Sequence, residues 1–312
     1  GSVTQMPMYF LAQANPTLYN LMNNSLFNAN TDLNASVKSC EQVKSEITQG
    51  QNPYQDWATI SLGDTWKKEL SLTAEQGKDM NEAKKTVDQT AGDDGVAWSQ
   101  GKSTNTGLRA GGKGQPVIHV VADTVKAGYN AVLGRELTSD APAPIGSALY
   151  EKFPTPTSAS DWATNVLGDQ DITTCNDASC KNAQGGTAGR GLLPWLTDCN
   201  GENKNNCTTA LRDTLGKLVT GNLSMTKENL MSVSAEDQVI SPQVIQSIRL
   251  MDRSQQGIIT NKLAQEIAVQ RLIDKALMVR TILETGGQVP VIATNEPAQK
   301  ILRQAIAQLD SD

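Results

Sequence analysis

The segment Gln255–Thr285, QQGIITNKLAQEIAVQRLIDKALMVRTILET, carries the longest unbroken helical periodicity in the chain. Its apolar side chains fall on two neighbouring rows: Ile259, Leu263 and Ile267, then Leu272, Ala276, Val279 and Leu283. A stripe this wide must pack against at least two neighbours, and about thirty residues form a rod of roughly 45 Å. The segment therefore predicts the central helix of a bundle. A two-stranded coiled coil is less favoured, because the charged residues form no repeating ladder.

The region around this helix also has a helical pattern. Gly286 and Gly287 predict a left-handed end to the long helix, and Pro290 follows shortly after. Further helices are expected at residues 208–220, 226–233, 242–251 and 296–310. All thirteen aromatic residues (five Trp, five Tyr, three Phe) lie at or before Trp195, so the C-terminal core must be aliphatic.

The N-terminal part has weaker patterns. We expect an N-terminal arm at 1–30, then a helical but loop-rich part at 31–207, packed as one unit with an aliphatic helical part at 208–312. Within the middle part the pattern indicates a helix at Leu33–Ile47, a short helix at Asn52–Ile60 with a turn at Gly63, a surface segment from Gly77 to Gly114, and a helix at 117–134. A proline-rich loop follows at 138–160, and Ser160-Asp161-Trp162 opens a short helix that ends at Leu167-Gly168. The predicted fold is mainly α, an irregular helical bundle around one long C-terminal helix with a loop-rich, disulfide-stapled middle section.

Composition excludes several classes of protein. The net charge of −6 and the pI near 5.0 argue against a nucleic-acid or anionic-membrane surface, which needs clustered Lys and Arg. The apolar runs are far shorter than the roughly 20 residues of a membrane-spanning helix. The chain begins Gly1-Ser2, which is typical of a cleaved tag, and we expect that an export signal preceded it in the native protein.

The cysteines are the clearest chemical signal. Four of the five, Cys175, Cys180, Cys199 and Cys207, fall within 33 residues that are rich in turn-forming side chains. Zinc sites usually show two paired knuckles, each with two to four intervening residues, whereas here the spacings are four and seven and only the first fits that range. Disulfides are favoured over metal binding or reduced thiols, and the sequence-local pairs Cys175–Cys180 and Cys199–Cys207 over the two other pairings. Cys40 is then the free thiol.

Other candidate motifs are weak. His119, the single histidine, lies in an apolar run, and we interpret it as structural rather than catalytic. Gly101-Lys102-Ser103-Thr104 resembles the end of a P-loop, but the spacing to Gly95 is one residue too long. The acidic pairs Asp93-Asp94 and Asp169/Asp171 could serve as paired carboxylates in glycoside cleavage, yet such residues are more often loop or cap residues. We therefore expect no catalytic, cofactor-binding or metal-binding residues.

Several short motifs, taken in order, resemble one protein family. They are Leu33-Asn34-Ala35-Ser36 with Ser39-Cys40-Glu41, Gly50-Gln51-Asn52-Pro53-Tyr54 with Trp57, Gly63-Asp64-x-Trp66, Ala83-Lys84-Lys85, Gly95-Val96-x-Trp98, Gly112-x-Gly114-Gln115-Pro116, Ala127-Gly128-Tyr129-Asn130, Leu167-Gly168-Asp169-Gln170 with Cys175, Gly191-Leu192-Leu193-Pro194, Val233-Ser234-Ala235 and the Leu263–Leu283 helix. The family is encoded in the transfer-gene clusters of integrating conjugative elements of Gram-negative bacteria, and the similarity covers about residues 31–310.

The resemblance implies a component of a conjugative type IV secretion apparatus, exported to the periplasm, and it brings no catalytic residues. Two features depart from the family pattern. Ala110 stands where the family has a cysteine that would be a plausible partner for Cys40, and the Cys199–Cys207 loop resembles an insertion. The expected partners are other proteins of the transfer apparatus, with no direct contact to nucleic acid and no cofactor.

Two hypotheses from different classes follow. The leading one is a non-enzymatic assembly or scaffold protein of the mating apparatus. The other is a periplasmic, peptidoglycan-directed hydrolase or lytic enzyme of the same apparatus, with Glu284 near a helix end as its acid. The second lacks an aromatic sugar-binding groove, because the chain has no aromatic residue after Trp195.

Overall fold

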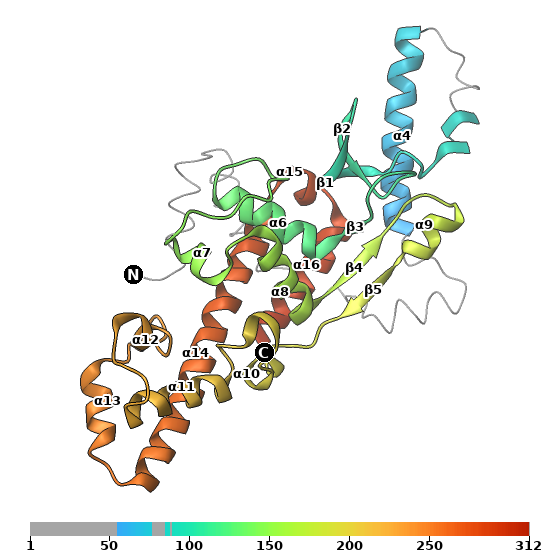
Figure 1. The fold of residues 1–312 in the computed structure, drawn as a ribbon. Coiled ribbons are helices and arrows are strands. Elements are labelled where there is room, and N and C mark those ends of the chain that lie inside the picture. Colours follow the sequence, from blue (N-terminus) through green and yellow to red (C-terminus); the bar gives the residue numbers. More distant parts are fainter. Residues whose placement is uncertain (1–54, 77–84, 88, 312) are drawn as a thin grey trace. The chain divides into compact units, whose positions relative to one another are not determined.

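The computed structural model describes residues 55–76, 85–87 and 89–311, with the backbone alone for 66–76. This part of the chain is mainly helical, as predicted, with two small antiparallel sheets and two disulfides (Figure 1). It divides into two compact units. The described residues up to Gly189 together with Val279–Ser311 form unit 1, and Arg190–Met278 form unit 2. Helix α14 (Arg253–Gly287) therefore contributes residues to both units. The arm at 1–30, the helix at 33–47 and Cys40 lie outside the described residues.

Unit 1 holds all the described strands. Its elements are α4 (Gln55–Gln76), β1 (Val96–Thr104), β2 (Gly107–Ala110), β3 (Ile118–His119), α6 (Val120–Val132), α7 (Ala148–Lys152), α8 (Pro156–Leu167), β4 (Gly168–Ile172), α9 (Ala178–Ala183), β5 (Gly185–Ala188), α15 (Pro290–Ala293) and α16 (Glu296–Ser311). Strands β1 and β2 form one hairpin with a register shift between Ala97 and Lys102, and β3, β4 and β5 form a three-stranded sheet in that order. Helix α6 packs on α8 and on α16.

Aromatic side chains fill the core of this unit. Trp98 on β1 is fully buried and meets Trp57 of α4 edge to face, with ring centroids 5.8 Å apart. Phe153 and Trp162 form a second pair at 5.7 Å. Burial of Trp98 corrects the prediction that residues 77–114 are a surface segment, because the alternation around it forms a strand whose inward side chains reach the core.

All the regular secondary-structure elements of unit 2 are helices. It contains α10 (Pro194–Thr197), the 3₁₀ turn η1 (Gly201–Asn203), α11 (Thr208–Thr220), α12 (Lys227–Met231), α13 (Pro242–Arg249) and most of α14 (Arg253–Gly287). Its core is aliphatic, with Leu215, Ile245 and Ile267 completely buried. Trp195 on α10 is the one tryptophan between Arg190 and Met278.

Several predicted helix boundaries are confirmed and others are wrong. Helix α11 spans the predicted residues, and α14 extends two residues beyond each predicted end. The turn predicted at Gly63 is absent, because α4 continues through this residue into a run of good helix formers. Gly286 and Gly287 are helical rather than left-handed. Helix α8 begins at Pro156, four residues before Ser160, with a capping box formed by Thr155 and Ser158.

None of the described helices combines the length and the apolar character that a membrane span requires.

Candidate functional site

Strand β4 places two carboxylates on one face of the three-stranded sheet. Side chains two residues apart in a strand point to the same side, so Asp169 and Asp171 share a face. The antiparallel register sets His119 of β3 opposite Asp171, and Thr187 of β5 opposite Asp169. The neighbouring pair Ile118 and Ile172 points the other way and is completely buried. A short alternating strand thus gathers four polar side chains in one place.

His119 and Asp171 form the closest polar contact of this group. The imidazole Nδ1 lies 2.6 Å from the Asp171 Oδ1, and the two side chains are 48% and 33% exposed. The contact is a hydrogen bond when the imidazole is neutral and an ion pair when it is protonated. Because Nδ1 faces the carboxylate, Nε2 is left to interact with a ligand or with solvent.

Asp169, which lies on strand β4, caps the first turn of helix α6 with its side chain. Its carboxylate accepts hydrogen bonds from the backbone N–H of Val121 at 2.7 Å, of Ala122 at 3.0 Å and of its own neighbour Gln170 at 2.7 Å. The residue at the N-cap position, His119, makes no such side-chain bond. Burial raises the pKa of Asp169 in spite of these three donors and the nearby imidazole. The helix N-terminus is therefore stabilised by an acidic side chain from the sheet.

The first turn of α6 itself carries a buried carboxylate. Asp123 is 7% exposed and accepts hydrogen bonds from the indole Nε1 of Trp98 at 2.7 Å and the backbone N–H of His119 at 2.9 Å. Burial raises the pKa of Asp123 to about 6, while these hydrogen bonds and the imidazole of His119 act in the opposite direction. Asp123 thus links the fully buried Trp98 to the chain segment that carries His119.

Because the pKa of Asp123 is raised in the folded protein, we expect the free energy of unfolding to fall as the pH rises. The folded protein binds the Asp123 proton more tightly than the unfolded chain does, so the favourable contribution is complete below about pH 4 and is lost as the pH passes through 6. The change from 3.8 to about 6 corresponds to about 3 kcal/mol. In denaturant titrations, the stability of the wild type relative to Asp123→Asn should fall by about this amount between pH 4 and pH 7.

The control for this experiment is Asp140→Asn, which removes a carboxylate at an exposed position. A difference between wild type and Asp123→Asn that stays constant over the same range would contradict the assignment.

Helix α8 supplies the opposite wall of a pocket. Ser160, Asp161, Thr164 and Asn165 recur at the spacing that places them on one side of a helix. With the sheet residues and Ala122 they line a cavity of about 460 Å³, whose full lining is His119, Ala122, Ser160, Asp161, Thr164, Asn165, Asp169, Asp171 and Thr187. This volume is in the range of small-molecule sites. The lining contains three carboxylates and no Lys or Arg.

The arrangement has the parts of an acid–base site. A histidine oriented by a carboxylate can accept or deliver a proton at its free nitrogen. The same pocket can also bind a cation through its carboxylates. His119, interpreted above as structural, does begin a helix, but its half-exposed side chain also lines this pocket.

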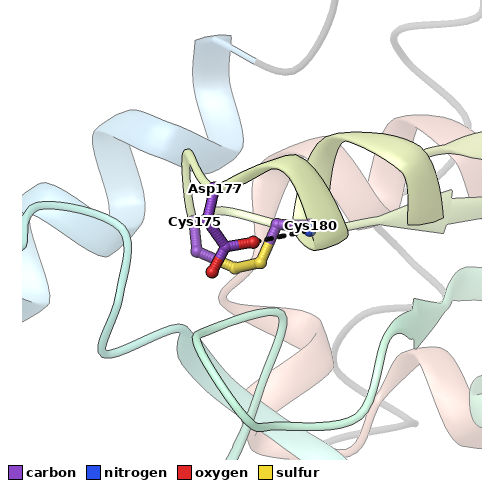
Figure 2. A group of neighbouring side chains, drawn as sticks. All are labelled: Cys175, Asp177 and Cys180. Atoms are coloured by element: carbon purple, nitrogen blue, oxygen red, sulfur yellow. Dashed lines mark hydrogen bonds between the residues drawn. A yellow bond between two sulfur atoms is a disulfide. The ribbon is translucent and has the colours of Figure 1, made fainter.

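The cysteine cluster is the second candidate site. The structure contains the disulfides Cys175–Cys180 and Cys199–Cys207, which are the sequence-local pairs. Among the described residues, Cys175, Asp177 and Cys180 form the single group of three potential metal ligands that lie close together (Figure 2). The two sulfurs are bonded to each other there, so neither is available as a thiolate ligand.

Asp177 in this group has a structural role. It begins α9, and its carboxylate accepts hydrogen bonds from the backbone N–H of Cys180 at 2.8 Å, the dashed line in Figure 2, and from the Ser179 hydroxyl at 2.6 Å. These bonds lower the pKa of Asp177. The disulfide and this cap hold the connection between β4 and β5 (Figure 1).

The structure also locates the remaining sequence candidates. Gly101-Lys102-Ser103-Thr104 is part of β1, so its backbone N–H groups do not form a phosphate-binding loop before a helix. Glu284 lies on α14 with its carboxylate 2.6 Å from Arg280, which also bonds Asp310 of α16. Burial raises the pKa of Glu284, while Arg280 opposes the shift. Glu284 is therefore part of an ion-pair group that joins two helices.

Sequence reasoning named Asp169 and Asp171 as a pair and His119 apart from them, and did not bring the three together. The missing step was the strand at Gly168–Ile172, where acidic residues alternate with Gln170 and Ile172 between a glycine and two threonines. Asp123 was missed altogether, because a single acidic residue inside an apolar helical pattern gives no signal of its buried contacts.

Comparisons of the chain with protein-family models, with curated proteins and with solved structures gave no match.

Proposed function

We propose that the protein is an exported, non-enzymatic component of a conjugative type IV secretion apparatus, which acts in the periplasm as an assembly or scaffold protein for DNA transfer between cells. The ordered motifs between residues 31 and 310 support this family, and the two disulfides support an oxidising compartment. The helical core of unit 2, which includes part of α14, would be the frame, and its partners would be other proteins of the apparatus.

The observation that carries the scaffold role is an apolar row on α14. Val269, Ile273 and Leu277 follow one another at intervals of four residues, so they share one face of the helix. They are 41%, 43% and 46% exposed, whereas Ile267 on the same helix is completely buried. Single exposed apolar residues are ordinary, but a continuous row is typical of a surface that binds a protein partner.

A photo-crosslinking amino acid at Ile273, in cells that carry the element, would test this proposal. We expect a defined adduct with another protein of the apparatus, and none from the same group at Gln246, an exposed position on α13 of the same unit. Ile273→Lys should lower the transfer frequency about tenfold or more at normal protein level, because the charge would be buried against the partner. Gln246→Lys should transfer normally. Equal transfer by both variants, without any adduct at Ile273, would contradict the scaffold role.

The compartment has a separate test in the count of free thiols. Protein isolated from its native host should have one cysteine that reacts with an alkylating agent after denaturation without reductant, and peptide mass spectrometry should identify it as Cys40. Both disulfides close short loops, so reduction should loosen residues 175–207 and leave the helices of residues 208–311 folded. Five alkylated cysteines would contradict the periplasmic assignment.

The alternative function is a peptidoglycan-directed hydrolase, and the contact between His119 and Asp171 is the observation that favours it. This pair could act as a general base in the polar pocket. A zymogram on cell-wall material with His119→Gln and Glu284→Gln separates the two functions. A wild-type protein that clears the cell wall, with clearing lost in either variant, would replace the scaffold proposal by an enzymatic one.

A further inference from the structure

The pocket between α8 and the three-stranded sheet has a serine hydroxyl on its wall that forms no hydrogen bond with the described residues. Ser160 is 3% exposed, and no described residue forms a hydrogen bond with its hydroxyl. A serine in a helix either bonds the carbonyl four residues before it or points away from the helix. The unpaired Ser160 hydroxyl at the pocket wall is therefore available to a bound molecule.

The charges on the lining determine the kind of ligand. Asp161, Asp169 and Asp171 repel anions, and His119 is the one lining residue that can carry a positive charge. Asp169 is already bonded by three backbone N–H groups. No described residue bonds the carboxylate of Asp161, so this group has the most capacity for a new partner. The pocket thus offers negative charge and several acceptor atoms to a cation.

The spread of these groups favours an organic cation over a metal ion. A bound Ca²⁺ or Mg²⁺ needs several oxygen atoms within about 2.6 Å of the ion. Within the described ranges, no three acidic or histidine side chains of this pocket lie close enough together to form such a group. A cavity of about 460 Å³ instead fits a molecule of several heavy atoms.

We infer that this pocket binds a primary ammonium or guanidinium group on a short aliphatic stem. Asp161 and Asp171 supply the charge, the Ser160 hydroxyl accepts one N–H, and the methyl group of Ala122 lies beside the stem. The cationic group belongs either to a free small molecule, such as a diamine, or to a Lys or Arg side chain of a partner protein. The inference does not depend on the proposed scaffold function, because the pocket lies in unit 1 and the apolar row lies in unit 2.

Amide-detected NMR titration of the purified protein tests the site. The probes are putrescine as a free diamine, N-acetyl-arginine amide as a basic side chain, and CaCl₂ as a metal ion. We expect saturable shifts of the Ala122 and Asn165 amides at millimolar concentration of one or both organic cations. Putrescine alone would identify a free amine as the ligand, and the arginine derivative alone would identify a side chain. Saturation by CaCl₂ alone, or by none of the probes, would overturn the inference.

Two variants with one control complete the test. Asp161→Asn and Ser160→Ala should each raise the Kd about fivefold or more, since the first removes a negative charge from the pocket and the second removes the hydroxyl that accepts an N–H of the ligand. Asp140→Asn removes the same charge outside the pocket and should leave the Kd unchanged. Ser160→Ala should leave the Tm nearly unchanged, because the hydroxyl forms no hydrogen bond with another described residue. An unchanged Kd in both pocket variants would overturn the assignment of these residues.

Discussion

Gly128→Ala should destabilise unit 1 by more than about 3 kcal/mol, at the upper end of the range for overpacking. A Cβ atom at Gly128 of α6 would overlap the backbone carbonyl of Ile282 on α14, and one at Gly286 would overlap the carbonyl of Thr124. The two helices therefore approach each other backbone to backbone. Neither side can yield by rotating a side chain, so one of the helices would have to move.

The matched control is a glycine of α14 with open space around it. A Cβ atom at Gly257 would meet nothing within 4 Å, so Gly257→Ala should stabilise the helix by up to about 1 kcal/mol through helix propensity alone. Denaturant unfolding of Gly128→Ala, Gly286→Ala and Gly257→Ala measures all three effects. An increase in stability for all three variants would show that α6 and α14 are not in backbone contact.

Ile267→Ala should cost roughly 2–5 kcal/mol, as expected for a completely buried aliphatic side chain. Ile267 lies in the aliphatic core of unit 2, among residues of α11, α13 and α14. Its loss would leave a cavity that the surrounding leucine and isoleucine side chains fill only in part. The measurement is the free energy of unfolding of the wild type and of the variant, each obtained by denaturant titration of the whole chain.

Leu277→Ala on the same helix is the internal comparison. The periodicity alone predicts an equally large loss, but Leu277 is 46% exposed, and we now expect less than about 1 kcal/mol. Equal costs at the two positions would mean that the exposed row of α14 is covered in solution.

The long helix, with Leu277 on it, shows what the spacing of apolar residues predicts and what it does not. A spacing of three to four residues fixes the helix and its approximate ends, but the stripe here is so wide that Val269, Ile273 and Leu277 remain 41–46% exposed. Which part of the stripe is buried depends on the positions of α11, α12 and α13, and the sequence of α14 does not contain that information.

Strands were harder to predict than helices. Strand β1 has a glycine and a run of polar residues in its outer half, so its pattern resembles a surface loop, although Trp98 lies in the core. The candidate pocket depends on cross-strand register, which sets His119 opposite Asp171 across a separation of 52 residues. The disulfides were predictable because each joins cysteines that are close in sequence.

The distribution of tryptophan makes each unit optically distinct. Unit 2 contains Trp195 alone, and the other four tryptophans lie before Gly189. Fluorescence of a Trp195→Phe variant would thus come from unit 1 only, and the difference from the wild type would report on unit 2. Denaturant titrations of the two proteins, compared in this way, can show whether the two units unfold together or in sequence.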